Sequence, residues 1–230
     1  MVRSRLVAVA VVVLGLCVLG CGSAADGAER AGDAGDAAAA MSDGEGQRRP
    51  IDVNDLGYDR GSPDAPVLVL EFSDFGCPYC SRFALSSLPQ IEEEFIHDGV
   101  VRWKYVPFVM GMFPNGAEAA RASECAAEQG EAGFWAMHDR LYRNQSAWKA
   151  TSGPRELFVS YARALELDDD AFADCYDSSD AALERINLNN ALAARLGVRA
   201  TPTFFVNGVR VQGALPMEHF RLLLKGAAAQ

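Results

Sequence analysis

A short apolar run leads directly into two closely spaced cysteines, and this junction limits the folds that the chain can adopt. Val67 to Ser73 (VLVLEFS) is seven residues long and mostly apolar, which favours a buried strand over a helix. Cys77 and Cys80 follow in the stretch FGCPYCSRF. Pro78 suits the first turn of a helix, because its missing N–H would have no helical partner there. The sequence therefore predicts a strand that ends before a cysteine pair and a helix that begins at it.

The remaining patterns predict a small sheet interrupted by helices. After a helix over 81–95, with a kink expected at Pro89, Val100 to Val106 has the pattern of the next strand of a βαβ unit. Helical patterns fill about 115–197, in the segments 117–129, 132–142, 154–165, 170–176 and 180–196. Strand-like runs over 203–206 and 209–212 flank the hairpin dipeptide Asn207-Gly208, and a last helix is expected over 216–226. The predicted fold class is α/β with a helical insertion.

The start of the chain has the pattern of an export signal. Arg3 and Arg5 precede the apolar run Leu6 to Leu19, whose 14 residues fit a signal-peptide core and fall short of a membrane-spanning helix. The run ends in VLGC, which resembles the bacterial lipoprotein processing box. We therefore expect a signal peptide over 1–20 and a lipid-bearing N-terminus at Cys21. Cleavage near Ala24, or an uncleaved anchor, are the alternatives.

Composition separates the next segment from the folded part. Residues 21–50 are mostly Ala, Gly, Asp, Glu and Ser, and cannot bury enough apolar surface to offset the entropy of ordering, so we expect a tether there and a domain over 51–230. The formal net charge of -10 leaves no basic face for a phosphate backbone, which argues against nucleic-acid binding. The expected location is the cell envelope, in the periplasm or on the outer face of the cytoplasmic membrane.

Three interpretations of Cys77 and Cys80 compete. A structural zinc site needs about four ligands, yet there is no second Cys-x-x-Cys motif, and His97, His138 and His219 stand alone, so no metal is expected. A purely structural disulfide between such close residues would remove little chain entropy and would stabilise little. The third interpretation is a reversible redox site.

The spacing gives the redox interpretation a physical basis. Cys77 would lie just before the first helical turn, where unpaired N–H groups and the helix dipole stabilise a thiolate that can attack a disulfide at neutral pH. Cys80, one turn further on, would face the same side of the helix. It could therefore resolve a mixed disulfide or close an intramolecular one. The sequence thus predicts a dithiol–disulfide exchange site.

The order of strand, FGCPYC, helix, helical insertion and ATPTFFVNG makes a family resemblance specific. Over roughly Ser62 to Gly226, the chain resembles the DsbA-like branch of the thioredoxin superfamily, which comprises exported bacterial thiol:disulfide oxidoreductases. The resemblance implies a thioredoxin-like fold with a helical insertion between the second and third core strands. It implies no metal and no organic cofactor.

The resemblance also implies roles for the matching residues. Cys77 matches the exposed nucleophilic cysteine of the family and Cys80 its buried resolving partner, with Pro78-Tyr79 shaping the site between them. Thr201-Pro202 matches the cis-proline loop beside the active disulfide. The Pro202 peptide bond would be cis, and the backbone at Thr201 would pair with an extended substrate segment.

Two charged residues complete the site that the resemblance implies. Glu71, six residues before Cys77, matches the buried acid beneath the disulfide, and we expect it to accept the proton of Cys80. A buried carboxylate is costly unless it has a role or a partner. Lys104 stands where some members supply the charged partner of this acid. The alternative for Lys104 is an exposed strand residue.

The dipeptide Pro78-Tyr79 departs from the most strongly oxidising members, which have a histidine there, so the motif does not give the direction of exchange. We expect an oxidase that acts on unfolded or reduced exported proteins and is reoxidised by a quinone-linked membrane partner. The alternatives are a reductase or isomerase with the same site, or a client-binding lipoprotein with an idle dithiol. Isomerases usually carry a dimerisation domain, for which residues 51–66 are too few.

Cys125 and Cys175 lie 50 residues apart, on helical segments that could run antiparallel. We expect a structural disulfide between them, and two buried free thiols are the alternative. Cys17 lies within the leader and would be lost with it. The apolar loop PFVMGMFPNG could line a groove for unfolded substrate or could pack internally.

Overall fold

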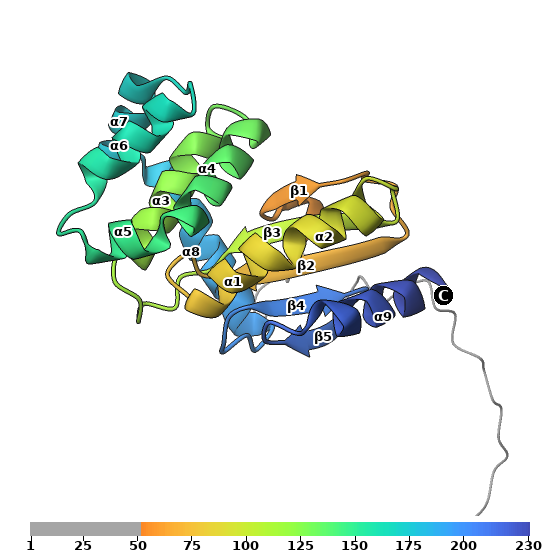
Figure 1. Cartoon of the computed structure of the whole chain (residues 1–230). Helices are drawn as coiled ribbons and strands as arrows, with labels where there is room; N and C mark the ends of the chain where they lie inside the picture. Colours follow the sequence, from red (N-terminus) through yellow and green to blue (C-terminus); the bar gives the residue numbers. More distant parts are fainter. Residues whose placement is uncertain (1–51) are drawn as a thin grey trace, which may run out of the picture. The chain divides into compact units, whose positions relative to one another are not determined.

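A five-stranded sheet organises residues 52–230, the part of the chain that this computed structural model describes. Its strand order is β1-β3-β2-β4-β5 (Figure 1). The predicted signal peptide over 1–20, the predicted tether over 21–50 and the predicted lipid attachment at Cys21 lie outside the described residues. None of the helices beyond residue 51 is long and apolar enough to cross a membrane.

The strand before the cysteines lies at the centre of the sheet. β2 (Val67–Ser73) pairs in parallel with β3 (Val101–Pro107) and antiparallel with β4 (Thr203–Val206). β1 (Tyr58–Arg60) pairs antiparallel with β3 at one edge, after a 3-10 turn over Val53–Asp55, and β5 (Val209–Gln212) pairs with β4 at the other. Because helices cover both faces of β2, its sequence is a nearly continuous apolar run instead of an alternating one.

The helix after the cysteines is interrupted at the predicted proline. α1 (Pro78–Ser86) and α2 (Leu88–Ile91) are separated by Ser87, which caps both, and a π-helical turn over Glu92–Ile96 follows α2. Pro89 cannot donate a backbone hydrogen bond, and its ring excludes the carbonyl one turn earlier, so it is placed in the first turn of α2. The kink expected at Pro89 is thus a break in the helix.

Different helices cover the two faces of the sheet. α1 and α9 (Met217–Ala228) pack on one face, where four aromatic rings lie with centroids 4.7 to 6.0 Å apart: Phe83, Trp103, Phe204 and Phe220. α8 (Asp180–Arg195) packs on the other face against Phe72 and Val106. Side chains alternate between faces along a strand, so Glu71 and Ser73 lie on the α1 face.

The predicted helical insertion is present between β3 and β4. It comprises α3 (Gly116–Ala127), α4 (Glu131–Arg143), α5 (Gln145–Ala150), α6 (Arg155–Ala164), α7 (Asp169–Ser178) and α8. α3 to α7 group together beyond one end of the sheet, and α4 packs against α1 (Figure 1). Sequence patterns missed α5, because six residues are too few to show a helical period, and β1, because it has three.

A disulfide joins Cys125 of α3 to Cys175 of α7, with the two Cα atoms 5.7 Å apart. Since it closes a loop between residues 50 apart, we predict that the double variant Cys125→Ala/Cys175→Ala loses about 4 kcal/mol of unfolding free energy in the chain-entropy model. Chemical denaturation measures this loss. An unchanged free energy of unfolding would show that the two thiols do not hold α3 and α7 together.

Candidate active site

The corner between β2 and α1 is fixed by its own backbone and by one carboxylate. Cys77 occupies the N-cap position with φ -75° and ψ 124°, and Pro78 begins the helix. Asp74 is buried, and its two carboxylate oxygens accept hydrogen bonds from the N–H groups of Gly76 (2.8 Å) and Met110 (2.8 Å). A Cβ atom on Gly76 would lie 2.3 Å from that of Phe113, so glycine is needed there. The corner is therefore clamped to the loop after β3.

α5 supports the same corner from the side of the insertion. The Gln145 side-chain amide donates to the carbonyls of Phe75 (2.6 Å) and Cys77 (2.9 Å), and Lys149 donates to the carbonyl of Gly76 (2.6 Å). The Cys77 carbonyl also accepts a hydrogen bond from the Ser81 N–H of α1 (3.1 Å), so the two side chains add to the backbone contacts of the corner. Neither Gln145 nor Lys149 is predicted from the sequence, because the six residues of α5 are too few to show a helical pattern.

Cys77 lies beside the loop that precedes β4. Its Sγ atom is 3.4 Å from the carbonyl oxygen of Thr201, and the Thr201–Pro202 peptide bond is cis. Thr201 also donates from its hydroxyl to the sulfur of Met110, at 3.3 Å. Cys77 is 2% exposed and Cys80 is fully buried, so Cys77 is less exposed than the resemblance implied. The neighbouring Tyr79 is 57% exposed.

The two sulfurs have opposite acidities. The pKa of Cys77 is lowered from 9.0 to about 6, and the largest cause is a hydrogen bond from the Cys80 thiol to the Cys77 sulfur. Hydrogen bonds from the backbone N–H groups of Cys80 and Tyr79 lower this pKa further, whereas burial raises it. The pKa of Cys80 is raised, first by burial and then by its interactions with Cys77. Cys77 is therefore a thiolate at neutral pH, and Cys80 keeps its proton.

Glu71 is fully buried on the α1 face of the sheet. Its two carboxylate oxygens accept hydrogen bonds from the Ser73 hydroxyl (2.5 Å) and from the indole N–H of Trp103 (2.9 Å). Burial raises the pKa of Glu71 from 4.5 to about 7, and the two hydrogen bonds counteract part of that rise. Glu71 can therefore hold or release a proton near neutral pH. No sequence pattern predicts the role of Ser73 at this carboxyl.

The prediction that Lys104 is the partner of Glu71 is wrong. In the parallel register Lys104 pairs with Leu70, whereas Tyr105 pairs with Glu71. Neighbouring residues on adjacent strands share a face, so Lys104 points to the face opposite Glu71. There its Nζ atom lies 2.8 Å from Asp59 of β1. Lys104 is 1% exposed, so it is not an exposed strand residue either.

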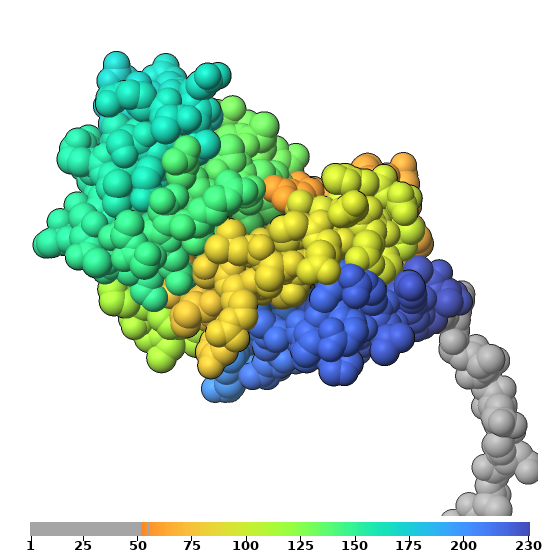
Figure 2. Space-filling view, in the orientation of Figure 1, coloured from red at the N-terminus to blue at the C-terminus, as the bar shows by residue number. Residues whose placement is uncertain are grey.

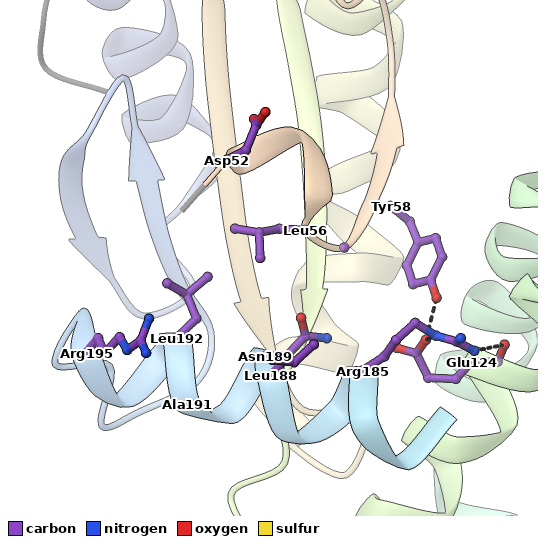
Figure 3. A pocket seen from close by; sticks show the side chains of 11 residues that line it. Asp52, Leu56, Tyr58, Glu124, Arg185, Leu188, Asn189, Ala191, Leu192 and Arg195 are labelled. Atoms are coloured by element: carbon purple, nitrogen blue, oxygen red, sulfur yellow. Dashed lines mark hydrogen bonds and ion pairs between the residues drawn. The ribbon is translucent and has the colours of Figure 1, made fainter. Parts of the chain in front are cut away.

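A hollow of about 330 Å³ lies apart from the cysteines, between α8 and the segment around β1 (Figure 3). Glu124 is buried at its edge, between the Tyr58 hydroxyl (2.5 Å) and the Arg185 guanidinium (2.7 Å). None of the residues around it belongs to the cysteine site. These hydrogen bonds tie β1 and α8 to α3, so we interpret the cluster as structural.

The sequence and the fold are similar to those of known proteins. A family model described as thioredoxin matches residues 55–226. The solved structure of oxidised BdbD from Bacillus subtilis is similar with a TM-score of 0.69 and 24% identity, over 76% of this chain and 94% of that one. Alpha-DsbA1 from Wolbachia pipientis is similar with a TM-score of 0.65 and 22% identity, over 74% and 90%. The predicted fold class is confirmed.

Curated relatives add a further likeness over part of their length. The Na(+)/H(+) antiporter NhaA 3 from Salinispora tropica is 36% identical over 182 residues, which are 78% of this chain and 26% of that protein. The chain spans about a quarter of the length of the curated relatives it matches.

Removing the thiol of Cys80 tests the assigned acidities. Thiolate absorbance of the reduced wild type should titrate with a pKa of about 6, and Cys80→Ala should move that pKa upward, because it removes the largest stabilising hydrogen bond. A lowered thiol pKa stabilises the reduced state at high pH, and this stability is lost as pH falls through about 6. Cys77→Ser is the control without a transition in this range. An unchanged midpoint in Cys80→Ala would contradict the assignment.

Proposed function

Because the chain belongs to the thioredoxin superfamily and has the DsbA-like fold, we propose that it is a thiol:disulfide oxidoreductase that introduces disulfides into exported proteins. The observation that supports this most directly is the difference in acidity between Cys77 and Cys80 within one helical turn. A nucleophilic thiolate and a protonated buried thiol are the two species that such exchange requires.

The first step of the proposed reaction starts from the oxidised Cys77–Cys80 pair. A substrate thiolate attacks the Cys77 sulfur, a mixed disulfide forms, the Cys77–Cys80 bond breaks and its electron pair goes to Cys80. Because Cys80 is fully buried, its thiolate is unstable and takes a proton. Glu71, with its pKa of about 7, is the acid that supplies this proton.

The second step releases the product. A second substrate thiolate attacks the substrate sulfur of the mixed disulfide, and Cys77 leaves as a thiolate. The pKa of about 6 makes Cys77 a good leaving group, because the rate rises as the pKa of the leaving thiol falls. The products are a disulfide in the substrate and the reduced enzyme, so sulfur bonds and electrons balance.

The surroundings of Cys77 are suited to an extended, unfolded substrate. The Thr201 backbone lies beside the sulfur and is the proposed pairing site for the substrate chain. Tyr79 is 57% exposed and Met112 67% exposed, so both offer apolar surface from the helix and from the loop after β3. We propose that these two side chains contact apolar residues on either side of the substrate cysteine.

The proposed cellular setting follows from the start of the chain and from the second disulfide. The Cys125–Cys175 bond suits an oxidising compartment outside the cytoplasm. We propose export, a lipid anchor at Cys21 and reoxidation of the reduced pair by a quinone-linked membrane protein. Cys21→Ala should move the protein from the membrane fraction to the soluble one. Retention on the membrane would argue against the lipid anchor.

Turnover on a reduced, unfolded protein with several cysteines tests the proposed activity. The oxidised enzyme should restore the native disulfides of this substrate, and Cys77→Ser should be inactive because it lacks the nucleophile. Cys80→Ala should be inactive as well, because it cannot form the Cys77–Cys80 disulfide that the first step consumes. The matched control is Ser123→Ala, which alters a buried serine of α3 away from the site. Full activity in Cys77→Ser would refute the proposal.

A further inference from the structure

The proposed acid and the sulfur that it must protonate are not joined directly. Among the described residues, the hydrogen bonds at Glu71 come from the Ser73 hydroxyl at Oε1 (2.5 Å) and from the Trp103 indole at Oε2 (2.9 Å). Cys80 makes neither of them. A group that contacts both Glu71 and Cys80 and can both give and accept a proton would connect them.

Ser73 interacts with both groups. It follows Glu71 by two residues on β2, so both side chains point to the same face of the sheet. That face is covered by α1, whose first turn carries Cys80. The Ser73 hydroxyl donates to Oε1 of Glu71 (2.5 Å), and the Ser73 side chain also interacts with the Cys80 thiol, whose pKa this interaction lowers. Glu71, Ser73 and Cys80 are all fully buried.

Of the two donors at Glu71, Ser73 can pass a proton on and Trp103 cannot. A serine hydroxyl has one proton to donate and two lone pairs that accept, so it can pass one proton on while it receives another. The Trp103 indole N–H only donates, so it can hold the carboxylate but cannot relay a proton. The arrangement of carboxyl, hydroxyl and sulfur thus forms a continuous path through the hydroxyl.

We propose that the Ser73 hydroxyl relays the proton between Glu71 and Cys80 during disulfide exchange. When Cys80 leaves as a thiolate, the Ser73 O–H proton moves to the sulfur and the Glu71 carboxyl proton moves to the Ser73 oxygen. Glu71 becomes a carboxylate, Cys80 a thiol, and Ser73 is unchanged. The reverse transfer deprotonates Cys80 when it attacks a mixed disulfide. This inference rests on the proposed function.

The rate at which excess glutathione thiolate reduces the oxidised enzyme tests the relay, because this step expels Cys80. Ser73→Ala should slow it by about 10²-fold, the lower end of general acid–base catalysis. Glu71→Gln should cause a loss of the same order, and the double variant should be no slower than either single one, since both interrupt one path. Ser73→Thr, which keeps the hydroxyl, should restore most of the rate.

A solvent isotope experiment separates a relay from a purely structural role. Two protons move together in the relay, so the wild-type rate should depend on the deuterium fraction along a curve, and Ser73→Ala should lose that curvature. If Ser73 only orients Glu71, the wild-type dependence would be linear. This wild-type measurement decides the question even if Ser73→Ala does not fold.

The outcomes also separate the relay from the function on which it rests. Ser123→Ala, a matched buried serine whose hydroxyl bonds to Ala120, should keep the wild-type rate. A wild-type rate in Ser73→Ala, with exchange that still requires Cys77, would overturn the relay and leave the function standing. Exchange that persists in Cys77→Ser would overturn the function itself.

Discussion

The hydrogen bond from the Cys80 thiol to the Cys77 sulfur is the interaction on which the site depends. It is the largest of the causes that give Cys77 a pKa of about 6, and it requires the two sulfurs to stay one helical turn apart. The corner is built to keep them there, because Asp74 holds it from within and Gln145 and Lys149 hold its carbonyls from the insertion. The helical insertion is thus part of the site as well as an addition to the sheet.

Burial of Glu71 determines the pH range in which its carboxyl gains and loses a proton. A carboxylate with a cation in contact would have a low pKa and could not act as an acid near neutral pH. Lys104 lies on the other face of the sheet with Asp59. Burial raises the pKa of Glu71 to about 7, and the hydrogen bonds from Ser73 and Trp103 and the charge of Arg60 counteract only part of that rise. A buried carboxyl with a pKa of about 7 is suited to exchange protons near neutral pH.

Local sequence patterns predicted β2, the cysteine corner and the order of the elements, because each depends on residues close together in the chain. The Cys125–Cys175 pair was predicted because these are the two cysteines left in the domain after Cys77 and Cys80. The family resemblance supplied the cis bond before Pro202. Lys104 was misassigned, because strand register decides which face a side chain occupies, and one sequence does not give register. Ser73 and α5 were missed for a related reason: their contacts join segments that only the folded chain brings together.

The reduction potential of the Cys77–Cys80 pair decides whether the site oxidises or reduces its substrates. Lowering the pKa of Cys77 from 9.0 to about 6 stabilises the reduced form at pH 7 by roughly 1–2 kcal/mol, which corresponds to on the order of 30 mV. The most direct test is the reduction potential of the Cys77–Cys80 pair in equilibrium with glutathione, with Cys125 and Cys175 kept paired. We predict a potential above that of thioredoxin, which is about -270 mV. A value at or below that of thioredoxin would contradict it and make the same site a reductant.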